Sequence, residues 1–229
     1  MTFNRPKTRW GAFGAHLLAS LAIFFALAAL MYFVWFPNGL FHFAGGWEGI
    51  RIIAGVDLVL GPALTLIIYK ASKPIKELTL DLSFVALIQA GALSGGIYII
   101  HQEKPEAVII AYDTIYILQA AELPSDFNSL TESNLTPPSY FVELPPHQDD
   151  IDNMLQSHAI MGEPLYSRTD LYTPITKNNF ELATLNLSSY QHCAHKARII
   201  TAFTTTVTCL KLSQEALKFE KLHPINLKP

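Results

Sequence analysis

The stretch DLVLGPALTLIIYK, residues 57–70, places a carboxylate and a Gly-Pro pair within an otherwise apolar run. It lies in residues 52–69, where Asp57 is the one charged side chain. At about 1.5 Å per residue, a helix of that length is about 27 Å long, close to the ~30 Å hydrocarbon core of a bilayer. The stretch therefore predicts a membrane-spanning helix that carries a polar interruption.

Two further apolar runs, residues 13–36 and 82–100, contain no Asp, Glu, Lys or Arg. Hydrophobic residues make up 50% of the chain, charged residues only 15%, and the mean hydropathy is +0.26. Uniformly apolar helices of this length are rare in soluble proteins. The predicted fold class is a membrane protein with three transmembrane α-helices, at residues 13–36, 52–69 and 82–100, followed by a periplasmic α+β domain.

The first run has an alternative interpretation as a cleaved signal peptide, because Arg5, Lys7 and Arg9 precede it. Cleavage at the small residues 26–28 would leave the apolar sequence LMYFVWF near the new amino terminus, where a polar stretch is normally found. We therefore keep the first run as a permanent span.

Basic residues predict the orientation of the spans. Three precede the first span and three lie in residues 70–81, whereas residues 37–50 contain no Arg or Lys. The positive-inside rule then places residues 1–12 and 70–81 in the cytoplasm and residues 101–229 in the periplasm. This last region has nine basic and fifteen acidic residues, a net charge of −6, which excludes nucleic acid as a partner.

Asp57, Gly61 and Thr65 follow one another at four-residue spacing and so share one face of the middle helix. Pro62 lacks an N–H and clashes with the carbonyl group of Leu58, which predicts a kink below Asp57. A polar stripe of this kind is expected to face protein rather than lipid.

Gln89 and Ser94 in the third span lie at depths from which either could hydrogen-bond to Asp57. Asp57 then has two interpretations: a structural carboxyl group that holds the second and third spans together, or a proton or substrate site. The lack of a second acid for a relay favours the structural interpretation. Gly91 and Gly95, also four residues apart, predict a helix-packing face, and the first span has a similar series at Gly11, Ala15 and Ala19, then Ala22 and Ala26.

Residues 101–229 predict an α+β domain. AVIIAYDTIYILQA, residues 107–120, is typical of a β-hairpin that turns at Asp113. RIITAFTTTVTCLKL, residues 198–212, is also strongly β-prone. A Pro-rich segment between them has loop character, interrupted by a short apolar run at 140–144, and helices are expected at 149–157 and 213–222.

Cys193 and Cys209 are the two cysteines of the chain. Outside the cytoplasm, such a pair favours a disulfide worth about 3 kcal/mol. The segment HCAH, with His192 and His195, leaves a metal site or a catalytic Cys-His pair as weaker alternatives, because its spacing matches no strong zinc pattern. The sequence has no phosphate-binding loop, paired-acid signature or nucleophile elbow. We therefore expect no enzyme activity, no cofactor and no metal.

Three segments, RWGAFGAHLLASL (9–21), AGVDLVLGPALTLIIYK (54–70) and ELTLDLSFVALIQAGAL (77–93), resemble the TfpX/TfpZ family of type IV pilin accessory proteins. The resemblance covers roughly the first hundred residues, by the order and spacing of these segments. It implies a bacterial inner-membrane protein that acts on pilus assembly, with membrane lipid, a major type IV pilin and the pilus assembly platform as candidate partners. Two alternatives from other classes remain, a small proton-coupled transporter and a membrane-anchored sensor, each using Asp57.

Overall fold

The structure is a computed structural model that describes residues 6, 8–162, 164–184, 187–190, 193–200, 205–211 and 220–221, with side chains up to residue 187. The chain divides into two compact units. A helical unit comprises Met1–Trp35 and Gly45–Gln102, and a sheet unit comprises Phe36–Ala44 and Glu103–Pro229.

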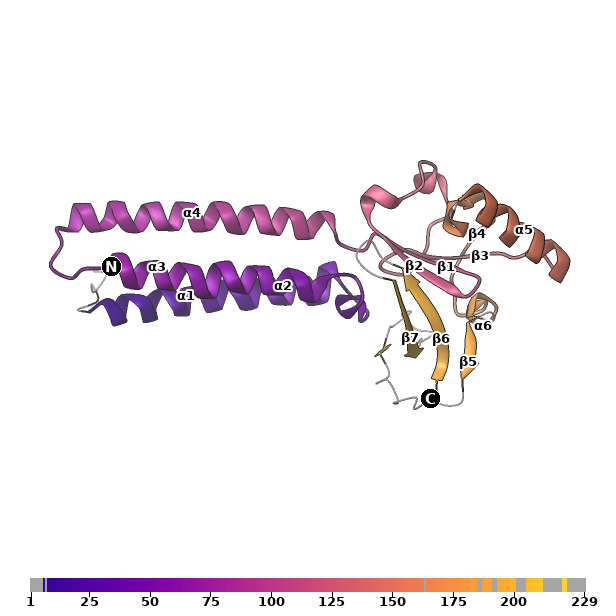
Figure 1. Cartoon of the computed structure of the whole chain (residues 1–229), viewed down its shortest axis with the longest axis horizontal. Helices are drawn as coiled ribbons and strands as arrows, with labels where there is room; N and C mark the ends of the chain where they lie inside the picture. Colours follow the sequence, from indigo (N-terminus) through magenta and orange to yellow (C-terminus); the bar gives the residue numbers. More distant parts are fainter. Residues whose placement is uncertain are drawn as a thin grey trace. The chain divides into compact units, whose positions relative to one another are not determined.

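Three long apolar helices build the helical unit, which confirms the prediction of three such helices (Figure 1). They span Arg9–Trp35, Gly46–Ile68 and Ile75–Gln102, and each is long and apolar enough to cross a membrane. The first is α1 (Arg9–Leu30) continued by the π-helical segment η1 (Met31–Trp35); the second joins α2 (Gly46–Ala54), the π-helical segment η3 (Gly55–Leu60) and α3 (Gly61–Ile68); the third is α4 (Ile75–Gln102).

The helices begin earlier than the apolar runs because polar residues form their first turns. Thr8 caps α1, where its Oγ1 accepts a hydrogen bond from the Gly11 N–H at 3.1 Å. In the middle helix, Pro62 lies in the first turn of α3, directly after the wide turns of η3. The Gly61 N–H bonds to the Val56 carbonyl, five residues back, so the chain accommodates the proline with a π-helical widening that contains Asp57.

The sheet unit is a mixed sheet with the strand order β4-β3-β1-β2-β6-β7-β8, and β5 pairs with β6. Its strands are β1 (Ala107–Ala111), β2 (Thr114–Leu118), β3 (Ser139–Val142), β4 (Tyr172–Pro174), β5 (Ser188–Tyr190), β6 (Cys193–Ile200), β7 (Thr205–Lys211) and β8 (Glu220–Lys221). The β1–β2 hairpin has the predicted antiparallel pairing, with Ala107 opposite Leu118. Parallel pairs of β1 with β3 and of β2 with β6 make the sheet mixed.

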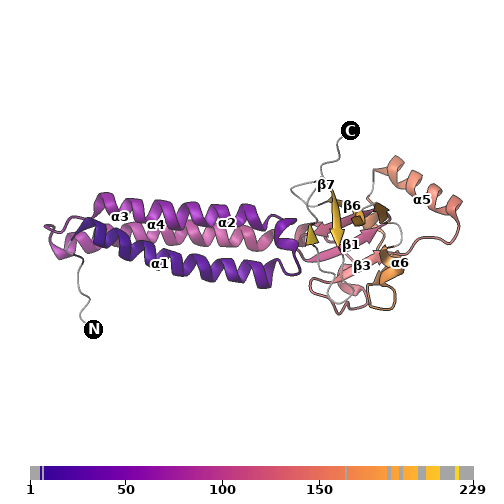
Figure 2. The same cartoon turned by 90° about the horizontal axis from the view of Figure 1, so that it is seen from below.

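The core of the sheet unit lies on both faces of β1 and β2. Ile109 and Ile115 are each 0% exposed. On the face that contains Ile109, tyrosines extend the core: the rings of Tyr140 and Tyr172 stack with centroids 5.5 Å apart. Burial raises the pKa of both phenols, with the larger effect on Tyr172. Two α-helices lie among the described residues of this unit, α5 (Gln148–Met161) and α6 (Phe180–Thr184), and Figure 2 shows α5 at its periphery.

The helix predicted at residues 213–222 is wrong for Glu220 and Lys221, which form β8. Lys211 of β7 pairs with Glu220, so the backbone of the β7 edge offers hydrogen bonds that override the local helix propensity. Residues 212–219 lie outside the described residues.

The connection Phe36–Ala44 belongs to the sheet unit, although it joins α1 to α2. Positive φ angles at Asn38 and Gly39 turn the chain, and the Asn38 side-chain amide donates a 2.7 Å hydrogen bond to the Thr136 carbonyl. Leu40 and Phe41 are buried there. The sequence predicts residue 36 as the end of the first span and residues 37–44 only as part of the connection between two spans.

Candidate functional site

The most deeply buried polar side chains of the helical unit meet in one place. Asp57 is 1% exposed, Ser20 is 2% exposed and Thr65 is 3% exposed. His16 and Gln89, both half-buried, complete a group that we call the polar cluster. Residues 16 and 20 come from α1, 57 and 65 from the middle helix, and 89 from α4, so the polar cluster joins all three long helices.

Hydrogen bonds link the five side chains into one chain. Asp57 Oδ1 accepts from Gln89 Nε2 at 2.5 Å and from Ser20 Oγ at 3.3 Å. Gln89 Oε1 lies 3.0 Å from His16 Nε2, and His16 Nδ1 lies 2.6 Å from Thr65 Oγ1. Because the Gln89 amide nitrogen donates to Asp57, the Gln89 amide oxygen is the acceptor toward His16. His16 Nε2 therefore carries the hydrogen that it donates to this oxygen. In a neutral imidazole, Nδ1 then accepts the Thr65 hydroxyl hydrogen.

Asp57 Oδ2 is buried and has no hydrogen-bond partner among the described residues. An unpartnered carboxylate oxygen is costly in an apolar environment, whether in a protein core or a bilayer. The other members of the polar cluster therefore satisfy only one side of this carboxyl group.

Gly61 makes the approach of α4 to the middle helix possible. A Cβ atom on Gly61 would lie 2.4–2.6 Å from the amide atoms of Gln89, closer than real Cβ contacts allow. Any side chain at this position would displace the amide that bonds to Asp57. Gly61 thus has a steric role in the polar cluster, and buried Pro62 follows it in the chain.

The structure brings together three of the residues that the sequence singled out, Asp57, Thr65 and Gln89, with Gly61 and Pro62 alongside. Ser94 is exposed and is not part of the polar cluster, and Gly91 and Gly95 are exposed on α4 with no atom within 4 Å of an added Cβ. In α1, the small residues Gly11, Ala15, Ala19, Ala22 and Ala26 are likewise exposed, so neither small-residue series packs within the helical unit.

Sequence reasoning missed His16 and Ser20. The available signal was their four-residue spacing in an otherwise apolar helix, which places both side chains on one face. Hydrogen-bonding side chains on such a face need polar partners on neighbouring helices.

Chemically, the polar cluster can hold helices together and can hold a proton, but it lacks the usual requirements of a catalytic centre. Its one carboxyl group is hydrogen-bonded to Gln89 and Ser20, and no second acid is bonded to it in the part of the chain that the structure describes. Among the described residues, no three His, Cys, Asp or Glu side chains are grouped as a metal site would need.

The cysteine prediction falls on β6 and β7. Cys193 is the first residue of β6, and Cys209 in β7 pairs with Lys196. Their side chains, and those of His192 and His195, lie outside the described residues, so the disulfide stays a prediction.

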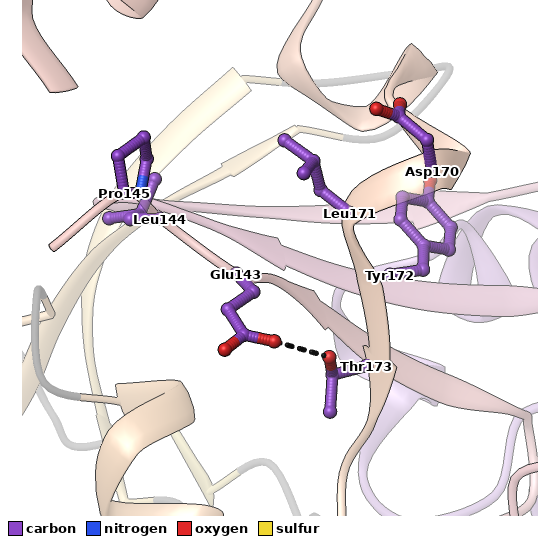
Figure 3. A pocket seen from close by; sticks show the side chains of 7 residues that line it. All are labelled: Glu143, Leu144, Pro145, Asp170, Leu171, Tyr172 and Thr173. Atoms are coloured by element: carbon purple, nitrogen blue, oxygen red, sulfur yellow. Dashed lines mark hydrogen bonds between the residues drawn. The ribbon is translucent and has the colours of Figure 1, made fainter. Parts of the chain in front are cut away.

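The sheet unit has a hollow of about 270 Å³ beside the edge strand β4 (Figure 3). Its two acids point in different directions: Glu143 accepts a 3.1 Å hydrogen bond from Thr173 Oγ1, while Asp170 lies on the far side of Tyr172. Arg168 donates two hydrogen bonds to Asp170, at 2.7 and 2.8 Å, and this pairing lowers the pKa of Asp170. Each acid in the hollow thus has its own partner, and the two do not form an acid-base pair.

The fold and the polar cluster together define a protein with three long apolar helices, joined through buried polar groups, and a separate mixed-sheet unit. The chain is 35% identical over 113 residues to "Fimbrial assembly protein, serogroups C1 and C2" of Dichelobacter nodosus. The matched stretch covers 49% of this chain and 86% of that protein. This chain belongs to the fimbrial assembly protein family.

Longer relatives from Dichelobacter nodosus match over the same number of residues. The fimbrial assembly proteins of serogroup E1 and serogroup I are 35% and 34% identical over 113 residues, and the match spans 44% of each relative. The matched stretch is thus less than half of these two relatives. No family model matches the chain, and no solved structure matches it.

Proposed function

We propose that the chain is a non-enzymatic inner-membrane protein of the TfpX/TfpZ type, which binds a cognate type IV pilin and promotes or modulates pilus assembly. The observation that carries this proposal is the similarity to fimbrial assembly proteins. The resemblance of residues 9–21, 54–70 and 77–93 to the pilin accessory family adds the type of pilus and the pilin as partner.

The membrane placement is supported by where the apolar side chains lie. Leu18, Phe25 and Leu87 are 70%, 64% and 72% exposed, although they belong to helices with few charges. Lipid is the solvent in which such surfaces are stable. The basic residues before the first helix and between the second and third then favour a cytoplasmic amino terminus and a periplasmic sheet unit.

The proposed contact with the pilin uses the exposed glycines of α4. Small residues let two helix backbones approach closely in lipid, where hydrophobicity does not drive association. Gly91 and Gly95 are exposed, and a Cβ at either position would meet no other atom. The face that they form is therefore free for the apolar helix of a membrane-anchored partner, while the polar cluster holds α4 in place.

Co-purification of the tagged chain with its pilin tests this proposal. We expect Gly91→Leu/Gly95→Leu to lower pilin recovery about tenfold, since adding two leucines separates the backbones, whereas the fold should be unaffected. Ala86→Leu/Ala90→Leu is the matched control, because this pair is exposed on the same helix at the same spacing but about 140° around the axis.

Two results would count against the proposal. Absence of pilin from the wild-type preparation, with the pilin present in the same membranes, would remove pilin binding. Equal recovery with both double variants would leave pilin binding in place and remove the assignment of the contact to the Gly91 and Gly95 face.

A proton-coupled transporter remains the second candidate, because Asp57 Oδ2 is buried without a described partner. Replacement of Asp57 by Asn separates this candidate from the first, because a proton-linked activity would need the carboxyl group.

A further inference from the structure

The end of the helical unit where α3 is connected to α4 has an open groove of about 450 Å³. Ile67 and Ile68, the last residues of α3, line one side, and Leu80 and Phe84 of α4 line the other. The remaining lining residues are charged, and they include Lys70 and Lys73 of the connection. The groove thus has an apolar part between the helices and a cationic part at the connection.

The apolar part is open. Ile67 is 73% exposed, Leu80 is 72% exposed and Phe84 is 63% exposed, although all three line the same groove. An apolar chain that filled the groove would cover these side chains without any change in the positions of the helices. This shape suits a flexible alkyl chain, which needs no hydrogen bonds from the surfaces that it covers.

The charged part has a small positive excess. Lys70, Lys73 and Lys76 lie within one short segment, and the carboxylates nearby are Glu77 and Asp81. Lys73 forms an ion pair with Asp81, and this hydrogen bond raises the pKa of Lys73. Lys73 also lines a second hollow of about 270 Å³ together with Lys76, so the two hollows share this residue.

We infer that this groove binds an anionic phospholipid, with the phosphate near Lys70 and Lys73 and an acyl chain along Ile67, Leu80 and Phe84. The inference rests on the membrane placement proposed above, in which this end of the helices lies at the cytoplasmic surface. A headgroup at the connection and a chain between the helices match the order of charged and apolar residues along the groove. A free phosphate would leave the apolar part uncovered.

Native mass spectrometry of the full chain, released from vesicles of equal parts phosphatidylglycerol and phosphatidylcholine, tests the inference. We expect phosphatidylglycerol to be retained in preference to phosphatidylcholine. Lys70→Gln should reduce that preference about fivefold, the effect of about 1 kcal/mol for one lysine at an anionic surface. Lys70 suits the test because its replacement leaves the Lys73–Asp81 pair intact.

Lys177→Gln is the matched control, since Lys177 is exposed in the sheet unit and the change removes the same charge. Phe84→Ala should lower the retention of both lipids by weakening the apolar contact. Glycerol 3-phosphate, which has the headgroup chemistry without the chains, should not displace bound phosphatidylglycerol.

Equal retention of the two lipids by the wild-type chain would overturn the inference, and so would an equal loss of preference in Lys70→Gln and Lys177→Gln. Displacement by glycerol 3-phosphate would show a site for the phosphate alone and would overturn the lipid assignment. The measurement needs no pilin. A lipid preference without pilin recovery would therefore refute only the proposed function, and pilin recovery without a lipid preference would refute only this inference.

Discussion

The helical unit and the sheet unit differ in which side chains they bury most deeply and which they leave exposed. In the helical unit, Asp57 and Ser20 are among the most buried residues, while large apolar side chains such as Leu87 are exposed. In the sheet unit, the most buried residues include the apolar Ile109 and Ile115. Among the described side chains of the sheet unit, the large apolar ones that are exposed are only Ile160, Met161 and Leu182.

With the helical unit placed in lipid, as we propose, this difference reflects two packing rules in one chain. In water, burial of apolar area is the main favourable term, at about 25 cal/mol per Å². In lipid that term vanishes between helices, and close packing and buried hydrogen bonds decide which faces meet. The polar cluster therefore has the same role in the helical unit that the buried Ile109 and Ile115 have in the sheet unit.

The largest expected effect comes from truncating one large apolar side chain to alanine in each unit. Ile109→Ala should lower the free energy of unfolding of the sheet unit by about 2–5 kcal/mol, because it leaves a cavity in a fully buried site. Leu87→Ala on the exposed surface of α4 should change stability by no more than about 0.5 kcal/mol. Urea-dependent proteolysis of the full chain in detergent, read separately for fragments of each unit, measures both. A similar loss for the two variants would refute the contrast between the units.

Asp57 gives the next largest effect. Asp57→Leu removes the acceptor of the Gln89 and Ser20 hydrogen bonds, and should cost about 1–3 kcal/mol. Asp57→Asn keeps a carbonyl oxygen at this position and should lose less. Unfolding in detergent mixtures with rising SDS content, followed by tryptophan fluorescence, reports on the helical unit, because Trp10, Trp35 and Trp47 all belong to it.

The same two variants separate the functional candidates. A structural Asp57 predicts normal pilin recovery with Asp57→Asn, and no proton uptake by vesicles that contain the wild-type chain. Proton uptake by the wild type that disappears in Asp57→Asn would favour the transporter and contradict the proposed function.

Gly61 allows a test of the steric part of the polar cluster. Gly61→Ala should destabilise the helical unit by about 1–2 kcal/mol, because the new Cβ displaces the Gln89 amide from Asp57. In a Gln89→Ala background the same change should be neutral or stabilising by up to about 1 kcal/mol, as expected for Gly→Ala in a helix. The detergent titration used for Asp57 measures both steps. Equal costs in the two backgrounds would show that Gly61 acts independently of Gln89.

The sequence predicts the three long helices and the first hairpin correctly because their signals are local. Apolar runs of membrane-spanning length predict the three helices, and the turn at Asp113 between two β-rich runs predicts the first hairpin. The position of each residue along its helix axis also identifies Gln89 as a candidate partner for Asp57, since the rise per residue fixes that position.

The remaining features depend on contacts between distant segments. Depth alone could not separate Gln89 from Ser94, because the rotation of α4 about its axis decides which of them faces Asp57. His16 and Ser20 join the polar cluster from α1 for the same reason. The parallel strand pairs and the assignment of Phe36–Ala44 to the sheet unit are set by long-range pairing, which leaves no periodic trace in the sequence.

The smallest expected effect concerns an exposed polar pair of the sheet unit, which sharpens the contrast with the buried polar cluster. Hydrogen bonds from Arg168 lower the pKa of Asp170 in the folded state. The pair therefore contributes its stability above the ordinary Asp pKa, and that contribution is lost as the pH falls through the lower, folded-state value.

Both side chains are substantially exposed, so Asp170→Asn should lower stability by no more than about 0.5 kcal/mol at pH 7. Urea unfolding of the wild type and Asp170→Asn at pH 7 and pH 3 checks this, and the difference between them should shrink at pH 3. A cost at pH 7 as large as that of Asp57→Leu would mean that exposure does not govern what polar pairs contribute in this chain.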